Sequence, residues 1–270
     1  MKENYVFISK GSFHNLILGK PRTVHYYLDH ICLNKLIGHL ISIKIKKDKP
    51  QCMYCKKTVS TLYRGYCFAC SRSLAICDLC VLQPYRCHYH LGTCREANWG
   101  LKNCFIPHYV YLSYTSNFKV GITRNSHLYN RLIEQGAIIG HPIILTPSRR
   151  TAGIIEQQLG KHFSLHTNWR KMLVTHDVPS IEEFESIAEK LWDLTHQNQS
   201  LNVIKSQLNN IKITYPWSGT KINAKQLNII DEPIEDVLLG CKGTYLIFES
   251  GVLNIRTLAG LTIDIGFNEY

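Results

Sequence analysis

Cysteine is the residue type whose chemistry stands out in this chain. The 270 residues contain eleven cysteines, and nine of them lie between Cys52 and Cys104. In a reducing compartment such clustered thiols bind metal or act in catalysis rather than forming disulfides. The N-terminus lacks a basic start followed by an apolar run, and no stretch approaches eighteen uncharged apolar residues. We therefore expect a cytoplasmic zinc protein with no membrane partner.

Two CxxC pairs begin the cysteine-rich segment. Cys52-Met53-Tyr54-Cys55 and Cys67-Phe68-Ala69-Cys70 are separated by a short stretch that contains Gly65. This spacing is typical of a zinc ribbon or a related knuckle, because each CxxC turn brings two sulfurs to one side of a tight loop. Two such turns complete a tetrahedron of thiolates about 2.3 Å from the ion. A closed site of this kind is structural.

A third pair and several later donors predict a second structural zinc ion. Cys77 and Cys80 form the pair, and we expect both to be ligands. The candidates for the two remaining positions are Cys87, His90, Cys94 and Cys104. The sequence does not choose among them, and it also allows a cross-braced arrangement in which the first and third pairs share one ion. A zinc-storing or redox-sensing role is a further alternative, because a CxxC pair can also undergo redox chemistry.

The charge of the chain favours a polyanionic partner. Lysine and arginine exceed aspartate and glutamate by 31 − 20 = 11. If two zinc ions held eight thiolates, the sites would contribute 4 − 8 = −4, leaving about +7. A basic surface of this size is compatible with DNA or RNA as partner, and also with a charge that serves solubility alone.

A regular alternation of strands and helices follows the cysteine-rich segment. The pattern predicts a β-hairpin, with strands over 108–113 and 118–123, and then a short helix over 126–135. A third strand over 137–146 follows. Ser148 is a suitable N-cap for a helix whose apolar stripe would contain Ala152, Ile155, Leu159 and Phe163. The expected order is β-β-α-β-α.

This order resembles the GIY-YIG nuclease superfamily, particularly its divergent branch with a lysine-valine-glycine second motif, over roughly Pro107 to Met172. Tyr109-Val110-Tyr111 takes the place of the first motif and Lys119-Val120-Gly121 the place of the second. Arg131 matches the arginine of the family's first helix, and Glu156 matches its metal-binding glutamate. The chain departs from the pattern where Tyr109 replaces a glycine and Lys119 replaces a tyrosine.

The resemblance implies a divalent-metal-dependent nucleic-acid phosphodiesterase. Glu156 would hold Mg²⁺, Tyr111 would accept a proton from the attacking water, and Arg131 would balance charge on the phosphorus. Lys119 would orient or neutralise phosphate. The alternative is a non-catalytic nucleic-acid-binding or adaptor protein that keeps the scaffold. Substrate contacts are expected from polar and basic residues on either side of the glutamate, namely Arg149, Arg150, Asn168, Trp169, Arg170 and Lys171.

The two ends of the chain are predicted to be rich in strands. Residues 36–47 alternate in hydropathy, and short strands are expected at 211–215, 243–248, 252–255 and 261–265. A polar linker is expected at 196–200. The prediction is an α+β protein with an N-terminal β segment (1–48), a zinc-ribbon-like domain (49–106), a GIY-YIG-like domain (107–198) and a β-rich domain (199–270). The N-terminal strand is a candidate member of that last domain. The whole arrangement is similar to a family of uncharacterised bacterial proteins of unknown function.

Overall fold

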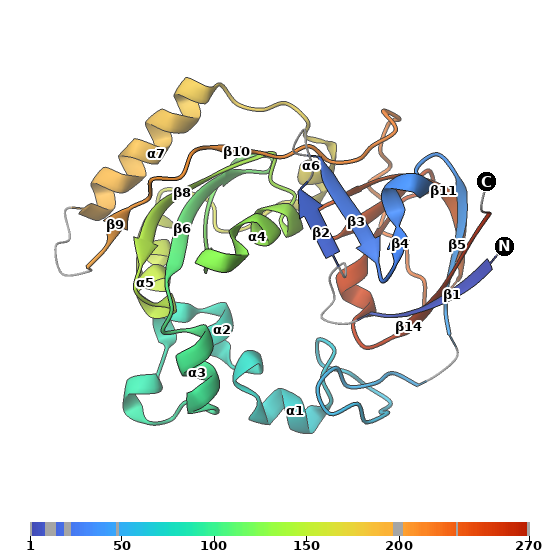
Figure 1. Cartoon of the computed structure of the whole chain (residues 1–270), viewed down its shortest axis with the longest axis horizontal. Coiled ribbons are helices and arrows are strands. Elements are labelled where there is room, and N and C mark those ends of the chain that lie inside the picture. The colour runs from blue at the N-terminus through green and yellow to red at the C-terminus, as the bar shows by residue number, and fades with distance from the viewer. Residues whose placement is uncertain are drawn as a thin grey trace. The chain divides into compact units, whose positions relative to one another are not determined.

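The computed structural model describes residues 2–8, 15–18, 23–46, 49–196, 202–230 and 232–268. These residues form two compact units, one made of 1–71 with 213–270 and the other of 72–212. Both contain strands, and helices are concentrated in the second unit, so the predicted α+β class is confirmed (Figure 1). Among the described residues, no helix has the length and apolar character needed to cross a bilayer.

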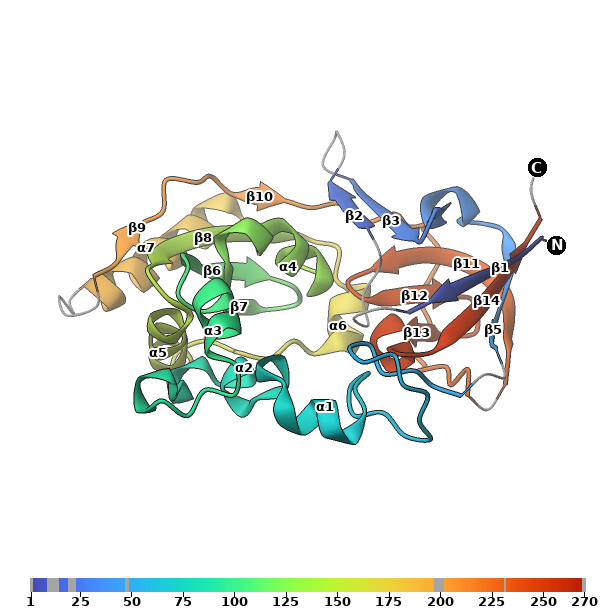
Figure 2. The same ribbon diagram turned by 60° about the horizontal axis from the view of Figure 1, so that its bottom comes forward.

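The first unit is built on a six-stranded antiparallel sheet in the order β1-β14-β5-β11-β12-β13 (Figure 2). A second sheet of three strands has the order β2-β3-β4. The strands of both sheets are β1 (Lys2–Phe7), β2 (Asn15–Leu18), β3 (Val24–Leu28), β4 (Ile31–Cys32), β5 (Leu40–Ile45), β11 (Ile234–Lys242), β12 (Tyr245–Phe248), β13 (Val252–Asn254) and β14 (Thr262–Phe267).

The N-terminal strands complete the C-terminal sheet, as the sequence suggested. β14 lies between β1 and β5, with Ile265 opposite both Asn4 and Ile43. Strand β5 has the alternating burial that its hydropathy predicted, because Ile41 and Ile43 are fully buried. The strand β11 was not predicted. It is buried on both faces near its end, so it lacks the alternation by which a half-exposed strand is recognised.

The second unit contains a mainly antiparallel sheet in the order β10-β8-β6-β7, with β9 also paired to β8. Its strands are β6 (His108–Tyr114), β7 (Phe118–Arg124), β8 (Ile139–Thr146), β9 (Ile204–Lys205) and β10 (Ile211–Lys212). The hairpin, the helix after it and the third strand follow the predicted order. Both β9 and β10 pair with β8, so they extend this sheet instead of the C-terminal one. Of the predicted polar linker, residues 197–200 lie outside the described part of the chain.

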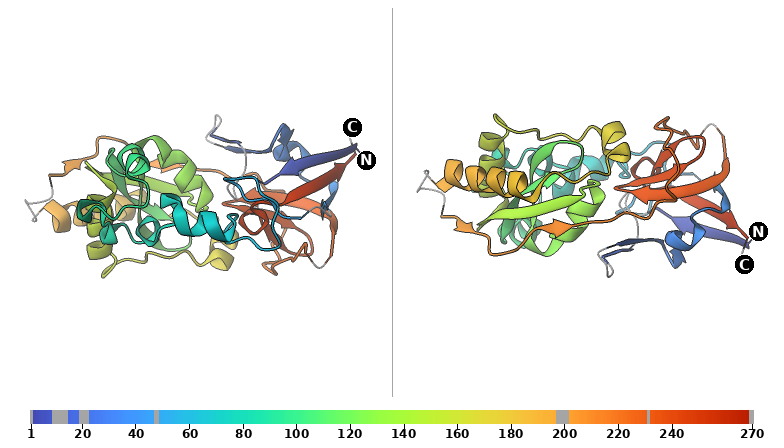
Figure 3. Two further views of the ribbon diagram at one scale, coloured as in Figure 1. Left: turned by 90° about the horizontal axis from the view of Figure 1, so that it is seen from below. Right: turned by 90° about the horizontal axis from the view of Figure 1, so that it is seen from above.

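Helices cover both faces of this sheet. The helices of the chain are α1 (Phe68–Ser73), α2 (Leu79–Leu82), α3 (Ala97–Asn103), α4 (Leu128–Glu134), α5 (Arg149–Leu159), α6 (Trp169–Val174) and α7 (Ile181–His196). Helix α7, in gold, lies along this sheet in the right-hand view of Figure 3. Val110 and Val120 on one face of the sheet pack into a core with Ile155 of α5 and Phe184 of α7. Helix α4 lies on the other face, where a side chain on Gly140 would collide with Leu132.

Helix α5 begins where its sequence predicts, because the Ser148 hydroxyl accepts a hydrogen bond from the Thr151 N–H at 3.2 Å. It ends at Leu159, so Phe163 lies beyond the helix, although it still packs against the same core. The stripe of Ala152, Ile155 and Leu159 faces the sheet. Glu156 therefore lies at the edge of the buried face of α5.

Candidate functional site

Four cysteines of the first unit converge on one point. The sulfurs of Cys52, Cys55, Cys67 and Cys70 all lie within 4.8 Å of one another. Three of these residues are buried, and the Cys55 and Cys67 sulfurs are 3.8 Å apart. Four thiolates at this spacing can bind one ion in a tetrahedron, which is the arrangement of structural zinc sites. We refer to these residues as the four-cysteine cluster.

Two tight turns position this cluster. Lys56, directly after the first CxxC pair, has a φ of 60°, and its N–H donates to the Cys52 carbonyl at 3.0 Å. Gly65 has a φ of 87° and accepts a hydrogen bond from the Met53 N–H at 2.9 Å. That φ lies in the left-handed region that glycine adopts without strain. The two turns bring the CxxC pairs face to face.

At Cys52, the effect of burial is outweighed by backbone hydrogen bonds, which lower the pKa to about 6. At Cys70, burial makes the thiolate form unfavourable unless a cation is present. It raises the pKa of Cys70 to about 12, and the neighbouring thiols of Cys67, Cys55 and Cys52 contribute in the same direction. Four adjacent thiolates repel one another, and a divalent cation offsets that repulsion. The donor set therefore fits a soft divalent ion such as zinc.

The later cysteines gather in the second unit around a separate, enclosed cavity. Cys80, Cys87, Cys94 and Cys104 all line it, together with Asp78 and His88. Cys77 and His90, which the sequence also proposed as ligands, do not line it, and His90 is exposed. Only one cysteine of the third CxxC pair, Cys80, therefore lines this cavity. The backbone is extended at Asp78, between Cys77 and Cys80. We refer to this space as the second cysteine cavity.

An open cleft of about 460 Å³ lies beside the edge strand β7 in the same unit. Arg124 of β7, Arg131 of α4, and Arg149 and Glu156 of α5 all line it. His108, His127, Asn130 and Glu134 line it as well. We refer to this space as the β7 cleft. Its three arginines and two glutamates give it a positive net charge.

Glu156 meets the edge of β7. The Ile122 N–H hydrogen-bonds to its carboxylate, and Arg131, Lys119 and Arg149 act on it electrostatically. Burial nevertheless raises the pKa of Glu156 above its ordinary value, although these three cations oppose the shift. Among the described residues, groups of three close His, Cys, Asp or Glu donors occur at the cysteine regions and not here. An ion bound at Glu156 would therefore keep most of its water ligands.

Tyr111 lies under this cleft and supports Arg131. Its side chain is 0% exposed, and burial raises the pKa of its hydroxyl. The Gln135 amide lies between the two residues. Its oxygen accepts from Arg131 Nε at 2.9 Å, and its nitrogen donates to Tyr111 Oη at 2.9 Å. The ring lies directly over Gly121, where a Cβ would be 2.5 Å from Oη. Glycine is required in this motif because the tyrosine occupies the space of a side chain.

Lys119 is also buried, with 7% of its surface exposed. Its ammonium group donates to the Thr167 hydroxyl at 3.1 Å. The ammonium group also interacts electrostatically with Glu156. Lys119 therefore connects this carboxylate to the segment that precedes α6. This position is suited to holding charge within the site, and less suited to direct contact with a large substrate.

The predicted substrate-binding residues fall into two groups. Arg149 lines the β7 cleft, and the neighbouring Arg150 is exposed on α5. The other four, Asn168, Trp169, Arg170 and Lys171, line a second hollow of about 520 Å³. Its remaining lining residues are Ser116, Asn117, Ser164, His166 and Thr167. The Arg170 guanidinium lies 4.3 Å from the centre of the Trp169 ring. The Asn168 side chain caps α6 by accepting from the Lys171 N–H.

One protein family matches the chain, over residues 38–263. Its description reads "Protein of unknown function (DUF2797)". The chain belongs to the DUF2797 family. Comparison with curated proteins and with solved structures gives no match. The DUF2797 match covers the four-cysteine cluster, the second cysteine cavity and the β7 cleft. It carries no information about the GIY-YIG superfamily, so that resemblance stays a prediction.

Several residues of these sites in the DUF2797 chain were not predicted. Asp78 lies inside the third CxxC pair and His88 directly follows Cys87, but neither was proposed as part of the site. Arg124, His108 and Glu134 reach the β7 cleft from the ends of strands and a helix. A signal was present for Arg124, because it ends the strand that carries the Lys119 motif, and residues at strand ends commonly form sites.

Proposed function

We propose that this protein is a zinc-stabilised, divalent-metal-dependent phosphodiesterase that acts on nucleic acid, with the β7 cleft as its active site. One observation carries the proposal: Glu156, Arg124, Arg131 and Arg149 all line the same open cleft. These residues come from three separate elements. Guanidinium groups bind phosphate through paired N–H donors, and a carboxylate beside them supplies a ligand for a hard cation.

Glu156 is the proposed ligand for Mg²⁺ or a similar ion. When bound, such an ion polarises the phosphate and stabilises the leaving oxygen. The Ile122 N–H and the neighbouring cations favour the charged form of the carboxylate, although burial outweighs them and raises its pKa. Arg131 balances the charge that develops on the phosphate oxygens. Arg149 and Arg124 hold the substrate phosphate in the cleft.

Tyr111 acts in this proposal as a positioning residue. Tyr111 does not line the cleft and burial raises the pKa of its hydroxyl, so the phenol is poorly placed to accept a proton from water. Its hydroxyl instead fixes Gln135, which fixes the Arg131 guanidinium. This role differs from that of the base implied by the family resemblance.

His108 is the proposed proton acceptor. It lines the cleft, and its Nδ1 donates to the Ile106 carbonyl at 2.7 Å, which leaves the lone pair on Nε2. Burial lowers the pKa of His108 to about 4, so the ring is neutral at pH 7. We expect His108→Asn to keep Mg²⁺-dependent binding of DNA or RNA while cleavage falls about 10²-fold, as for other general bases. Full activity in that variant would remove His108 from the mechanism.

The second hollow is the proposed track for the rest of the strand. Trp169 offers a stacking surface for a base, while Arg170, Lys171 and His166 lie around it. The contact between Lys119 and Thr167 places one wall of this hollow next to the site of Glu156. Aromatic and basic side chains combined in this way bind single strands without reading their sequence.

A non-catalytic nucleic-acid-binding or adaptor protein is the second candidate. The burial of Tyr111 and Lys119 favours it, because the two motif residues that the resemblance made catalytic are both held inside the protein. The β7 cleft would then bind a phosphate group without cleaving its ester.

Cleavage of labelled DNA and RNA by the purified full-length protein, with and without Mg²⁺, separates these candidates. Glu156→Gln removes the charged ligand and keeps the shape of the side chain. Glu183→Gln, at an exposed site on α7, is the matched control. The enzyme proposal expects Mg²⁺-dependent cleavage that Glu156→Gln abolishes and Glu183→Gln retains. Binding without cleavage in any metal establishes the adaptor instead.

We further propose two structural zinc ions and a cytoplasmic location. Nine of the eleven cysteines lie between Cys52 and Cys104, where they can bind metal as thiolates in a reducing compartment. A zinc-storing or redox-sensing role would instead require metal that leaves readily. Metal analysis after mild chelation and mild oxidation tests this, because structural sites retain their zinc under both treatments. Alkylation of intact cells followed by mass spectrometry tests for disulfides in the cellular protein.

A further inference from the structure

The second cysteine cavity has the size of a single atom. Its volume is about 20 Å³, enough for one water molecule or one metal ion. Trp99, Phe105 and Tyr89 close its apolar side, while four cysteines, Asp78 and His88 provide the polar groups. An enclosed space of this size, surrounded by soft donors, is suited to a metal ion and too small for an organic ligand.

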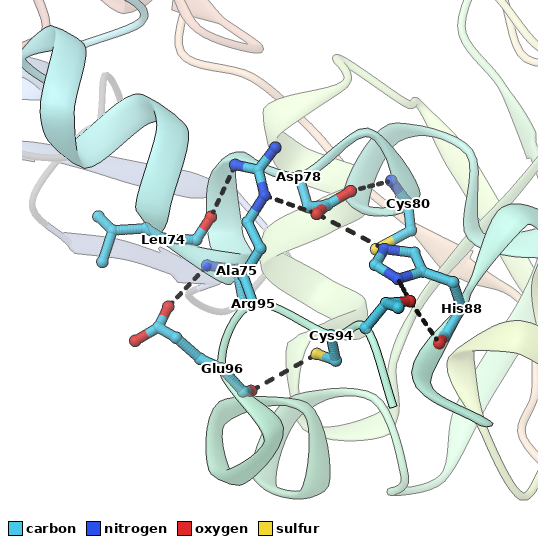
Figure 4. A network of polar contacts seen from close by, with 9 residues as sticks. Leu74, Ala75, Asp78, Cys80, His88, Cys94, Arg95 and Glu96 are labelled. Atoms are coloured by element: carbon cyan, nitrogen blue, oxygen red, sulfur yellow. Dashed lines mark hydrogen bonds and ion pairs between the residues drawn. The ribbon is translucent and has the colours of Figure 1, made fainter. Parts of the chain in front are cut away.

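The carboxylate and the imidazole in this cavity are already engaged with other groups (Figure 4). Asp78 accepts from Arg95 Nε at 2.7 Å through one oxygen and from the Cys80 N–H at 3.3 Å through the other. The Nδ1 of His88 is 2.7 Å from the Thr93 hydroxyl, which donates to the His88 carbonyl. That arrangement turns His88 Nε2 toward Asp78, at 3.6 Å. Both residues therefore orient the loop around Cys80.

The thiols of Cys80, Cys87, Cys94 and Cys104 also line the cavity. The Cys94 thiol donates to the Glu96 carbonyl at 3.6 Å, and Cys80 lies with Asp78 and His88 in a group whose ligand atoms are within 4.8 Å of one another. Cys87 and Cys104 act electrostatically on Cys80, and Cys87 and Cys94 on Cys104. We propose that this cavity binds a zinc ion through Cys80, Cys87, Cys94 and Cys104, in a closed and structural site. This ligand set differs from the expected one, because it excludes Cys77 and His90.

This ion would also hold one wall of the β7 cleft in place. The Arg149 N–H donates to the Cys104 carbonyl at 2.7 Å, and its guanidinium donates to the Val81 carbonyl at 2.5 Å. Val81 directly follows Cys80, so both anchors of Arg149 adjoin proposed ligands. Pro84 packs so closely on Gly153 of α5 that a Cβ there would be 2.5 Å from it. The zinc site thereby positions Arg149, whether the cleft cleaves nucleic acid or only binds it.

Zinc content of the full-length protein tests the ligand set. We expect two zinc ions per chain in the wild type, and one in Cys80→Ser, Cys94→Ser and Cys104→Ser. Cys77→Ser, a matched change in the same segment, should keep two, and His88→Ala should also keep two. Loss of an ion in Cys77→Ser or His88→Ala, or retention of both in Cys94→Ser, overturns the proposed ligands. One ion in the wild type overturns the site itself.

Cobalt substitution of the wild-type protein provides a second test that does not depend on the folding of any variant. If both sites have four thiolates, the sulfur-to-cobalt absorption should double between the first and the second equivalent. A weaker increment, with the ligand-field bands of a site that includes nitrogen, overturns the all-thiolate assignment.

Hydrogen exchange tests the positioning of Arg149 independently of any activity. The Arg149 amide, which is bonded to Cys104, should exchange at least about tenfold faster in Cys80→Ser than in Cys77→Ser. Equal protection in the two variants would show that the ion does not hold this wall of the cleft.

Discussion

The four-cysteine cluster and the β7 cleft are assembled from the chain in different ways. The cluster takes all of its donors from the segment 52–70, where two turns direct neighbouring residues to one point. The cleft takes His108, Arg124, Arg131 and Glu156 from four separate elements, and packing of the helices on the sheet brings them together. The first arrangement depends on local geometry and metal, and the second depends on the folded core.

Because of this difference, substitutions in the cluster should mainly change stability, and substitutions in the cleft should mainly change activity. In the cluster, a lost ligand removes metal-binding free energy, which is part of the folding free energy. In the cleft, charges have been brought together against the cost of burial, so their removal costs little stability or even increases it.

The largest expected effect follows from Cys52→Ser. We expect loss of one zinc ion and a large fall in the stability of the first unit, since structural zinc contributes on the order of 10 kcal/mol in zinc-finger peptides. Metal analysis with thermal unfolding measures both changes. A variant that keeps two ions and its melting temperature would contradict the structural role of the cluster.

Glu156→Gln should have the opposite pattern. Cleavage should fall by about 10²- to 10³-fold, the loss typical when an electrostatic group of an active site is removed. Stability at pH 7 should stay equal or rise. A carboxyl group whose pKa is raised on folding stabilises the protein at low pH, and this contribution is lost as the pH rises through the folded-state pKa. A glutamine has no such loss. Kinetics and thermal unfolding at pH 5 and 7 measure the two effects.

The acid side of the pH dependence should be set by Glu156. Its pKa is raised, so Mg²⁺ binding should weaken as the pH falls through a value above the ordinary one for glutamate. His108, whose pKa is about 4, stays neutral throughout this range. Calorimetric titration with Mg²⁺ between pH 5 and 7 tests this. An affinity that is independent of pH would show that Glu156 is not the ligand.

Tyr111→Phe should have a moderate effect on both properties. Loss of the hydroxyl leaves the Gln135 amide nitrogen without its acceptor and should cost about 1–3 kcal/mol of stability. Activity should fall about tenfold, because Arg131 is held less firmly, while the pH profile keeps its shape. A general base would instead change the profile and cost far more activity. The pH–rate profile of the variant therefore decides between the two roles.

Arg170→Ala should have the smallest effect. If Arg170 contacts one phosphate, the slope of log affinity against log salt should decrease in magnitude by about 0.7–0.9, with a modest loss of affinity. Binding of labelled single strands across a salt series measures this. An unchanged slope would exclude the second hollow from the nucleic-acid track.

The order of elements in the second unit and the four-cysteine cluster could be read from the sequence. The hairpin, α4, β8 and α5 follow periodicity and capping that are local, as the Ser148 cap shows. The partner of β10 could not be read in this way, because Ile211 and Lys212 have no pattern that distinguishes pairing with β8 from pairing with the C-terminal strands. Strand pairing across long stretches of chain is decided by the core as a whole.

The sequence by itself determined the donors of the four-cysteine cluster, since CxxC turns converge wherever they fold. The fold as a whole sets three other features: Cys77 does not line the second cysteine cavity, the Tyr111 hydroxyl is buried beneath Arg131, and Glu156 meets Arg149 beside β7. The two regions differ in the length of chain that determines their geometry. A turn fixes neighbouring residues through a few backbone angles, whereas a cleft is defined by how helices with apolar stripes pack on a sheet, which no single segment specifies.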